Sequence, residues 1–142
     1  MQDSDATRVA DIRVRLGARA AGAWRLSDDS LVRTAFSHAT DMPEDVVSSF
    51  CSASERFRLS DVEFGVVKAA VELLPVVSRR SHSGSPGSGR WLEAFDADRS
   101  IAVPILDDSG RLAAVFAVAL AADRFSDEEV ADLVTERALL SS

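Results

Sequence analysis

The sequence predicts an α+β domain built on a central antiparallel sheet of five strands, with helices over both faces. The best evidence is a hairpin pattern in which the largely apolar runs 100–106 and 112–120 are joined by the polar turn 107–111. Asp, Ser and Gly in that turn supply geometry that Val and Ile resist. Residues 115–120 are all apolar, so we expect their strand to be central and covered on both faces. A second hairpin pattern and a helix pattern at each end complete the α+β class.

Length, composition and charge limit what the chain can be. Its 142 residues, 46% apolar and 27% charged, fit one globular domain and are too few for two ordinary domains. We therefore expect a single domain over 1–142, with its core at about 5–140. The net charge of −7 argues against a nucleic-acid partner, because phosphate binding needs clustered cations. The lack of a long apolar run and the polar, acidic N-terminus predict a cytoplasmic protein without a membrane partner.

The N-terminal part of the chain predicts a helix followed by a hairpin. Apolar residues recur at helical spacing over 5–20, and Asp3 or Ser4 stands before them as a cap. The runs 21–26 and 31–38 flank a Ser-Asp-Asp-Ser turn, which is the pattern of two paired strands. In the second of these strands, alternation predicts an inward face made of Val32, Thr34, Phe36 and His38.

Two more helices are predicted in the middle of the chain. A Pro followed by acidic residues starts a short helix over 43–53. A longer helix is predicted over 60–74, capped by Ser60 or Asp61 and stopped by Pro75. The apolar spacing within this longer helix predicts a buried stripe of Val62, Val66, Ala69, Ala70 and Leu73.

The remaining segments predict a strand, a loop and two helical segments. Residues 76–80 have the pattern of a short strand, and 91–95 have that of a short amphipathic helical turn. Between them, residues 81–90 contain three Gly, one Pro and four Ser, which predicts a surface loop or a lid over a site. The final helix starts at Ser126, with Glu129 at the capping-box position.

Five short segments spread over about 5–140 form a recognisable pattern, namely Trp24-Arg25-Leu26, Leu74-Pro75-Val76-Val77, Arg99-Ser100-Ile101-Ala102-Val103-Pro104-Ile105, Gly110-Arg111-Leu112-Ala113-Ala114-Val115 and Phe125-Ser126-Asp127-Glu128-Glu129-Val130. In these segments the chain resembles the GAF domain, a small sensory module of bacterial signalling proteins. The resemblance implies a GAF-like, profilin-like sheet of five or six strands, with the terminal helices on one face and short helices and a loop over the other. It also implies a pocket under the segment at about 78–99, and terminal helices that pair with those of a second copy.

Trp91, Phe95 and Arg99 are the best candidates for a ligand-binding site. On a short helix, Trp91 and Phe95 are four residues apart and share a face. If the GAF resemblance holds, that face looks into the pocket, with Arg99 at the start of the strand beneath it. The strand carrying Ser78 and Arg80 would then form the border of the site. Aromatic walls with one cation suit a small organic anion or a planar ring.

The other reactive side chains predict no catalysis, metal or cofactor. Cys51 is the one cysteine, so the disulfide cycle of the methionine sulfoxide reductases in the GAF family lacks its second thiol, and we expect a buried, inert thiol beside Phe50. His38 and His82 are too few for a metal site without carboxylate partners, although His82 could face an anionic ligand. No Ser-His-Asp or Gly-x-Ser-x-Gly arrangement is signalled.

We therefore predict a non-catalytic sensory or regulatory domain that binds a small molecule and is a homodimer. Its terminal helices would carry the signal to an output protein. The alternative is a ligand-free dimerisation or protein-interaction module, whose pocket is filled by its own aromatic side chains. The residues predicted to bind the ligand are Trp91, Phe95, Arg99, Ser78, Arg80 and His82.

Overall fold

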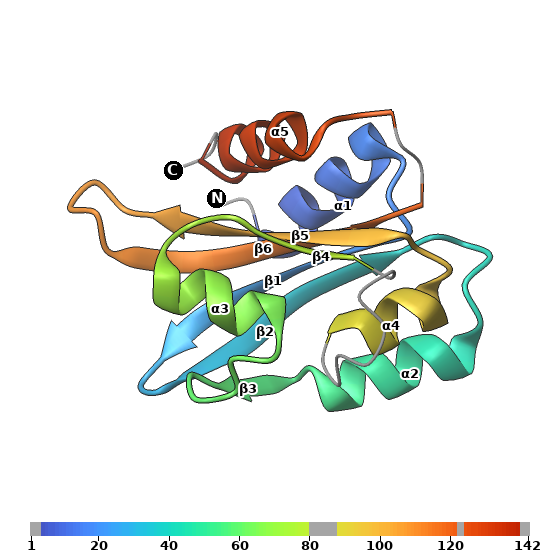
Figure 1. Cartoon of the computed structure of the whole chain (residues 1–142), viewed down its shortest axis with the longest axis horizontal. Helices are drawn as coiled ribbons and strands as arrows, with labels where there is room; N and C mark the ends of the chain where they lie inside the picture. The colour runs from blue at the N-terminus through green and yellow to red at the C-terminus, as the bar shows by residue number, and fades with distance from the viewer. Residues whose placement is uncertain (1–3, 80–87, 122–123, 140–142) are drawn as a thin grey trace.

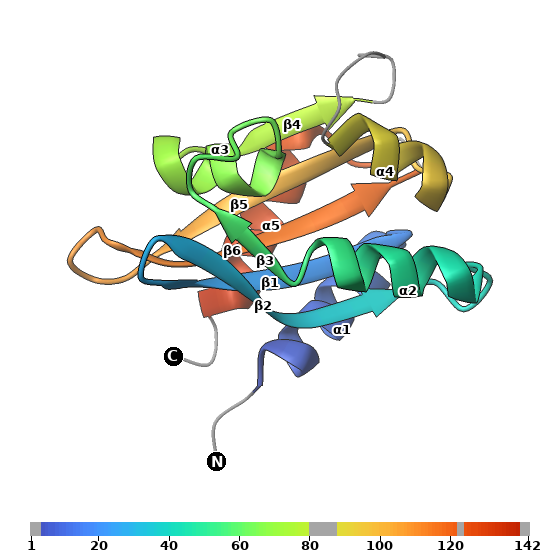
Figure 2. The same ribbon diagram turned by 90° about the horizontal axis from the view of Figure 1, so that it is seen from below.

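The computed structural model describes residues 4–79, 88–121 and 124–139, and it confirms the α+β class. Within these ranges, a six-stranded antiparallel sheet of order β3-β2-β1-β6-β5-β4 lies between two layers of helices (Figure 1). Helices α1 and α5 cover one face, and α2, α3 and α4 lie over the other (Figure 2). The strands are β1 (Ala20–Ser27), β2 (Ser30–His38), β3 (Arg56–Arg58), β4 (Val76–Arg79), β5 (Arg99–Leu106) and β6 (Leu112–Leu120). The helices are α1 (Asp5–Leu16), α2 (Glu44–Ala53), α3 (Gly65–Glu72), α4 (Ser88–Phe95) and α5 (Asp127–Leu139).

The C-terminal hairpin forms as predicted and occupies the middle of the sheet. Strand β6 pairs with β5 on one side and with β1 on the other. Its neighbouring residues Val115 and Phe116 belong to the cores on opposite faces, and they are 0% and 2% exposed. In the turn, the Asp107 carboxylate accepts hydrogen bonds from the backbone N–H groups of Ser109 and Arg111, at 2.9 and 3.0 Å. The polar turn therefore closes on itself, and both faces of β6 are covered.

The predicted inward face of β2 is confirmed at Phe36 but wrong at Thr34, because this strand contains a β-bulge. The pairing register of the β1–β2 hairpin shifts between Ala23 and Trp24, and Thr34 has no pairing partner in β1. An extra residue on one strand moves the side chains that follow it to the other face. Leu31, before the bulge, and Phe36, after it, therefore pack against the same core, whereas Thr34 is exposed.

Helix α3 begins later than predicted, and the short strand β3 precedes it. The backbone N–H of Arg58 donates to the Asp61 carboxylate at 3.3 Å, and the N–H of Phe64 donates to the Asp61 carbonyl at 3.2 Å. Asp61 therefore stabilises a turn between β3 and α3 instead of capping a helix. The predicted buried stripe is wrong at its two ends, where Val62 and Leu73 are 55% and 41% exposed.

Both terminal helices start at predicted caps. The Ser4 hydroxyl accepts a hydrogen bond from the Thr7 N–H at 3.2 Å. At α5 the capping box is reciprocal: the Ser126 N–H donates to the Glu129 carboxylate at 2.9 Å, and the Glu129 N–H donates to the Ser126 hydroxyl at 3.1 Å. Helix α1 ends earlier than predicted, because Gly17 adopts the left-handed conformation with φ 62°.

The two faces of the sheet carry different cores. Against the terminal helices α1 and α5, the core is mainly aliphatic and includes Ile12, Leu16, Ile101, Val103, Val130 and Val134. On the opposite face, under α2, α3 and α4, the core is rich in aromatic rings and includes Trp24, Phe50, Phe57, Leu92 and Phe95. Among the described residues, no helix is long and apolar enough to cross a membrane.

Candidate functional site

A small cavity lies between the sheet and the helices α2, α3 and α4. Its volume is about 70 Å³. Strands β1, β5 and β6 form its floor, and side chains from the surrounding strands and helices form its walls and roof. All but two of the chain's Phe and Trp residues line it, namely Trp24, Phe36, Phe50, Phe57, Phe64, Trp91 and Phe95.

The floor of the cavity consists of very small residues on the two central strands. Ala20 pairs with Ala119, and Gly22 pairs with Ala117, across the junction of β1 and β6. A Cβ atom at Gly22 would lie 2.8 Å from the indole ring of Trp24, closer than real Cβ contacts allow. Gly22 is therefore glycine because the Trp24 ring lies directly over it. Beside that ring, Ala20, Ala117 and Ala119 carry only methyl side chains, and this leaves the hollow.

The roof is organised around Phe50 of α2. Its ring centroid lies 5.1 Å from that of Phe36 on β2, and 5.1 and 4.9 Å from those of Trp91 and Phe95 on α4. The last two contacts are edge-to-face, the geometry that aromatic quadrupoles favour. The structure thus brings Trp91 and Phe95 together at the cavity, and Phe50 connects them to the opposite wall.

Few polar groups reach the cavity. The Trp24 indole N–H donates to the Ser54 carbonyl at 2.9 Å, so it is already engaged within the protein. Ser100 on β5 contributes the one hydroxyl group among the described lining residues. No charged side chain belongs to this described lining, which makes the site strongly apolar.

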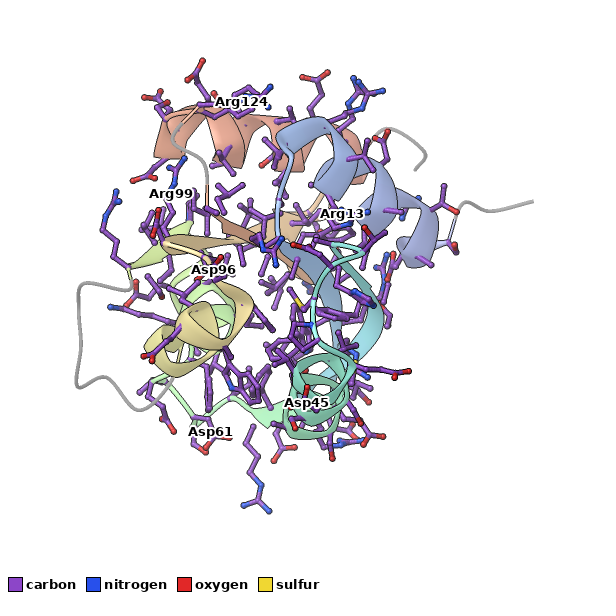
Figure 3. The ribbon with its side chains drawn as sticks, turned by 90° about the vertical axis from the view of Figure 1, so that its right-hand side faces the viewer. Arg13, Asp45, Asp61, Asp96, Arg99 and Arg124 are labelled. Carbon is purple, nitrogen blue, oxygen red and sulfur yellow. The ribbon has the colours of Figure 1, made fainter. Side chains whose placement is uncertain are left out.

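Arg99 does not lie at the cavity, which corrects the prediction that placed it beneath Trp91 and Phe95. Alternate residues of a strand point to opposite faces, and Arg99 shares the face of Ile101, in the core under α5. It is 5% exposed, and its guanidinium binds the Asp127 carboxylate and the Phe125 carbonyl. Figure 3 shows Arg99 on the α5 side of the sheet. Arg99 therefore anchors the start of α5.

The remaining predicted site residues do not line the described cavity. Ser78 on β4 is paired with Ser100, which is a lining residue, but Ser78 itself is not. Arg80 and His82 lie outside the described residues. The predicted cluster of six residues is thus reduced to Trp91 and Phe95 within the part of the chain that the structure describes.

The sequence alone did not predict the small residues of the cavity floor or the central position of Phe50 in its roof. A signal for the floor was present, since Ala20, Gly22 and Trp24 alternate along β1 and place small residues beside a large ring on one face. The role of Phe50 had no local signal, because it depends on α2 packing beside α4. Ser100 was visible as the first residue of an apolar run, but its face follows only from the strand register.

Cys51 is a free thiol on α2, and it is partly buried where full burial was expected. Its backbone carbonyl accepts a hydrogen bond from the Arg33 guanidinium at 2.6 Å, which ties α2 to β2. Among the described residues, no group of three or more His, Cys, Asp or Glu side chains is placed to hold a metal ion.

Comparison with known proteins identifies the fold. No protein-family model matches the sequence, and no curated protein matches it significantly. Among solved structures, a GAF domain/HD domain protein from Geobacter sulfurreducens superposes with a TM-score of 0.66 and 14% identity, over 95% of this chain and 87% of that one. The GAF domain of a phosphoenolpyruvate-protein phosphotransferase from Coxiella burnetii gives a TM-score of 0.66 and 18% identity, over 94% and 75% of the two chains.

An enzyme shares the same fold. Type II free methionine-R-sulfoxide reductase from Thermoplasma acidophilum superposes with a TM-score of 0.62 and 13% identity, over 95% of this chain and 89% of that one. Because the fold occurs both in an enzyme and in the GAF domains of larger proteins, it does not decide between these roles. The chain has a GAF-like fold, as its sequence resemblance implied.

Replacing Arg99 by Gln is expected to lower the free energy of unfolding by about 2–3 kcal/mol, because Asp127 and the Phe125 carbonyl lose a buried charged donor. Arg79→Gln is the matched control. Arg79 binds the other Asp127 oxygen at 2.7 Å, but its side chain is 46% exposed, so its loss should cost about 1 kcal/mol or less. Urea unfolding measures both variants, and equal losses would contradict the anchoring role of Arg99.

Proposed function

We propose that the chain is a non-catalytic sensory or regulatory domain that binds a small molecule in the cavity beside α4. The observation that carries this proposal is the hollow at the centre of the sheet. Ala117 on β6 and Ser100 on β5 lie in interior strands under a layer of helices, yet both are only partly buried. A close-packed core would bury such residues completely. The GAF-like fold also supports a sensory role.

Arg19 links the cavity to the terminal helices, so that a movement at the cavity could reach them. It lies in the connection between α1 and β1, and its Nε donates to the Phe95 carbonyl at the end of α4, at 2.9 Å. Its Nη1 binds Asp41 at 2.7 Å. Because Phe95 also lines the cavity, a ligand that displaces α4 would move Arg19 and with it the end of α1. An output protein would read that movement at α1 and α5.

Binding without catalysis fits the chemistry of the lining. Cys51 is the one cysteine of the sequence, so an intramolecular disulfide cycle of the reductase type has no second thiol. The Ser100 hydroxyl has no histidine or carboxylate beside it among the described lining residues, and an unactivated serine is a weak nucleophile. These observations favour a site that holds a molecule over one that transforms it.

A ligand-free dimerisation or protein-interaction module is the second candidate function. The observation that favours it is the size of the cavity. At about 70 Å³, it is well below the range of about 300–1,000 Å³ that is typical of ligand pockets. In this interpretation the rings of Phe50, Trp91 and Phe95 fill the space that a ligand would occupy.

Thermal unfolding with a panel of small metabolites separates these two candidates. A ligand that binds only the native chain, present at about 100 times its Kd, should raise Tm by about 5–10 °C. Ala117→Leu should abolish that increase, because the longer side chain fills the floor. Ala113→Leu, on the same strand but outside the cavity lining, is the matched control. No Tm response to any compound would favour the ligand-free module.

The proposed homodimer is formed by a second copy packing along α1 and α5, which lie side by side on one face (Figure 1). Val14 on α1 is 67% exposed on this layer, so Val14→Asp should weaken association at least about tenfold. Val71→Asp, at a position on α3 that is 54% exposed, should leave association unchanged. Sedimentation equilibrium at micromolar concentration is the measurement, and a monomeric unmodified chain there would contradict the homodimer.

A further inference from the structure

We infer that the cavity takes a small uncharged molecule, at most a single apolar or aromatic ring with one hydroxyl group, and that Ser100 selects the hydroxyl. This inference rests on the proposed function, since it names the ligand class of the same cavity. It follows from three properties of the site: the absence of charge from the described lining, the single hydroxyl group, and the size.

The described part of the lining gives a charged group nothing to bind. No Lys, Arg, Asp or Glu side chain is among its described residues. Arg99 precedes the lining residue Ser100 in the sequence, but its guanidinium binds the Asp127 carboxylate on the other face of the sheet. Moving an ionised carboxylate, phosphate or ammonium from water into such a site is unfavourable without a partner charge or several hydrogen bonds. Nucleotides, free amino acids and carboxylates are therefore poor ligands.

Among the described lining residues, very few side chains can form a hydrogen bond with a ligand. The Trp24 indole N–H donates to the Ser54 carbonyl, whereas the Ser100 hydroxyl has no hydrogen-bond partner among the described residues. A serine hydroxyl both donates and accepts, so it suits a ligand alcohol or phenol. Its place on β5 beside the alanine floor means that the polar end of the ligand lies against the sheet, and its ring lies among Phe50, Trp91 and Phe95.

The volume limits the size of a ligand that fits without a change in the lining. An engineered apolar cavity of about 150 Å³ holds one benzene molecule, and this cavity has about 70 Å³. A single ring therefore enters only if one lining side chain moves. Trp91 is the side chain suited to this movement, because it is partly buried whereas Phe50 and Phe95 are 9% and 5% exposed.

Isothermal titration calorimetry of the whole chain with four one-ring probes of similar size tests the ligand class. Toluene and benzyl alcohol are uncharged, benzoate carries a negative charge, and benzylamine is a cation at pH 7. We expect toluene and benzyl alcohol to bind, and benzoate and benzylamine to bind at least tenfold more weakly. Benzoate or benzylamine binding as tightly as benzyl alcohol would overturn the inference and leave the proposed function standing.

Three variants locate the binding. Ser100→Ala should weaken benzyl alcohol about three- to tenfold and leave toluene unchanged, because one neutral hydrogen bond is lost. Ala117→Leu should abolish binding of both probes, and Ala113→Leu should change neither. Unchanged binding in Ala117→Leu would overturn the inference, because the probes would then bind elsewhere. If no probe binds but a metabolite raises Tm, the ligand class is wrong; if nothing binds in either assay, the proposed function fails as well.

Discussion

The contact between the Trp24 indole and Gly22 is the constraint on which the cavity side of the molecule depends. The ring lies so close to the backbone of β1 that even a Cβ atom at Gly22 has no room. Across the strand junction, Gly22 faces Ala117, and Ala20 faces Ala119. Beside the Trp24 ring, the middle of the sheet is a flat floor of backbone and methyl groups. The rings of the helices opposite cover this floor but do not fill the space above it completely.

The two faces of the sheet are packed in different ways. Toward α1 and α5, long aliphatic side chains interlock, and a charged cluster of Arg79, Arg99 and Asp127 fixes the start of α5. Toward α2, α3 and α4, rings meet edge to face over small residues. The charged cluster therefore stabilises the layer that would carry a signal, and the apolar hollow lies on the layer that would receive it. Arg19, bonded to the last carbonyl of α4, joins the two layers.

The elements that the sequence predicted well are those with local causes. The turn at 107–111 contains its own hydrogen bonds through Asp107, and the start of α5 is defined by Ser126 and Glu129 within one helical turn. Such signals need no knowledge of the rest of the fold. The pairing of Trp91 with Phe95 on one helix face is of the same kind, since it depends only on a spacing of four residues.

The elements that were missed depend on partners distant in sequence. The bulge at Thr34 exists only in relation to β1, and the position of Phe50 depends on α2 lying beside α4. An Asp at position 61 could cap a helix or close a turn. It closes a turn here because its carboxylate accepts a hydrogen bond from Arg58, the last residue of β3. Arg99 was misplaced for a different reason. Its alternation with Ile101 along the strand indicates the face toward α5, but its charge and its position near Trp91 and Phe95 suggested a ligand.

The folded chain leaves an apolar hollow over Ala117, beside the ring of Trp24. Diffraction from crystals of the protein under xenon pressure tests it most directly, because xenon occupies apolar cavities without needing polar partners. We expect a xenon peak between Ala117 on the floor and the rings of Phe50 and Trp91. Well-ordered aromatic rings packed onto that floor, with no xenon between them, would contradict it.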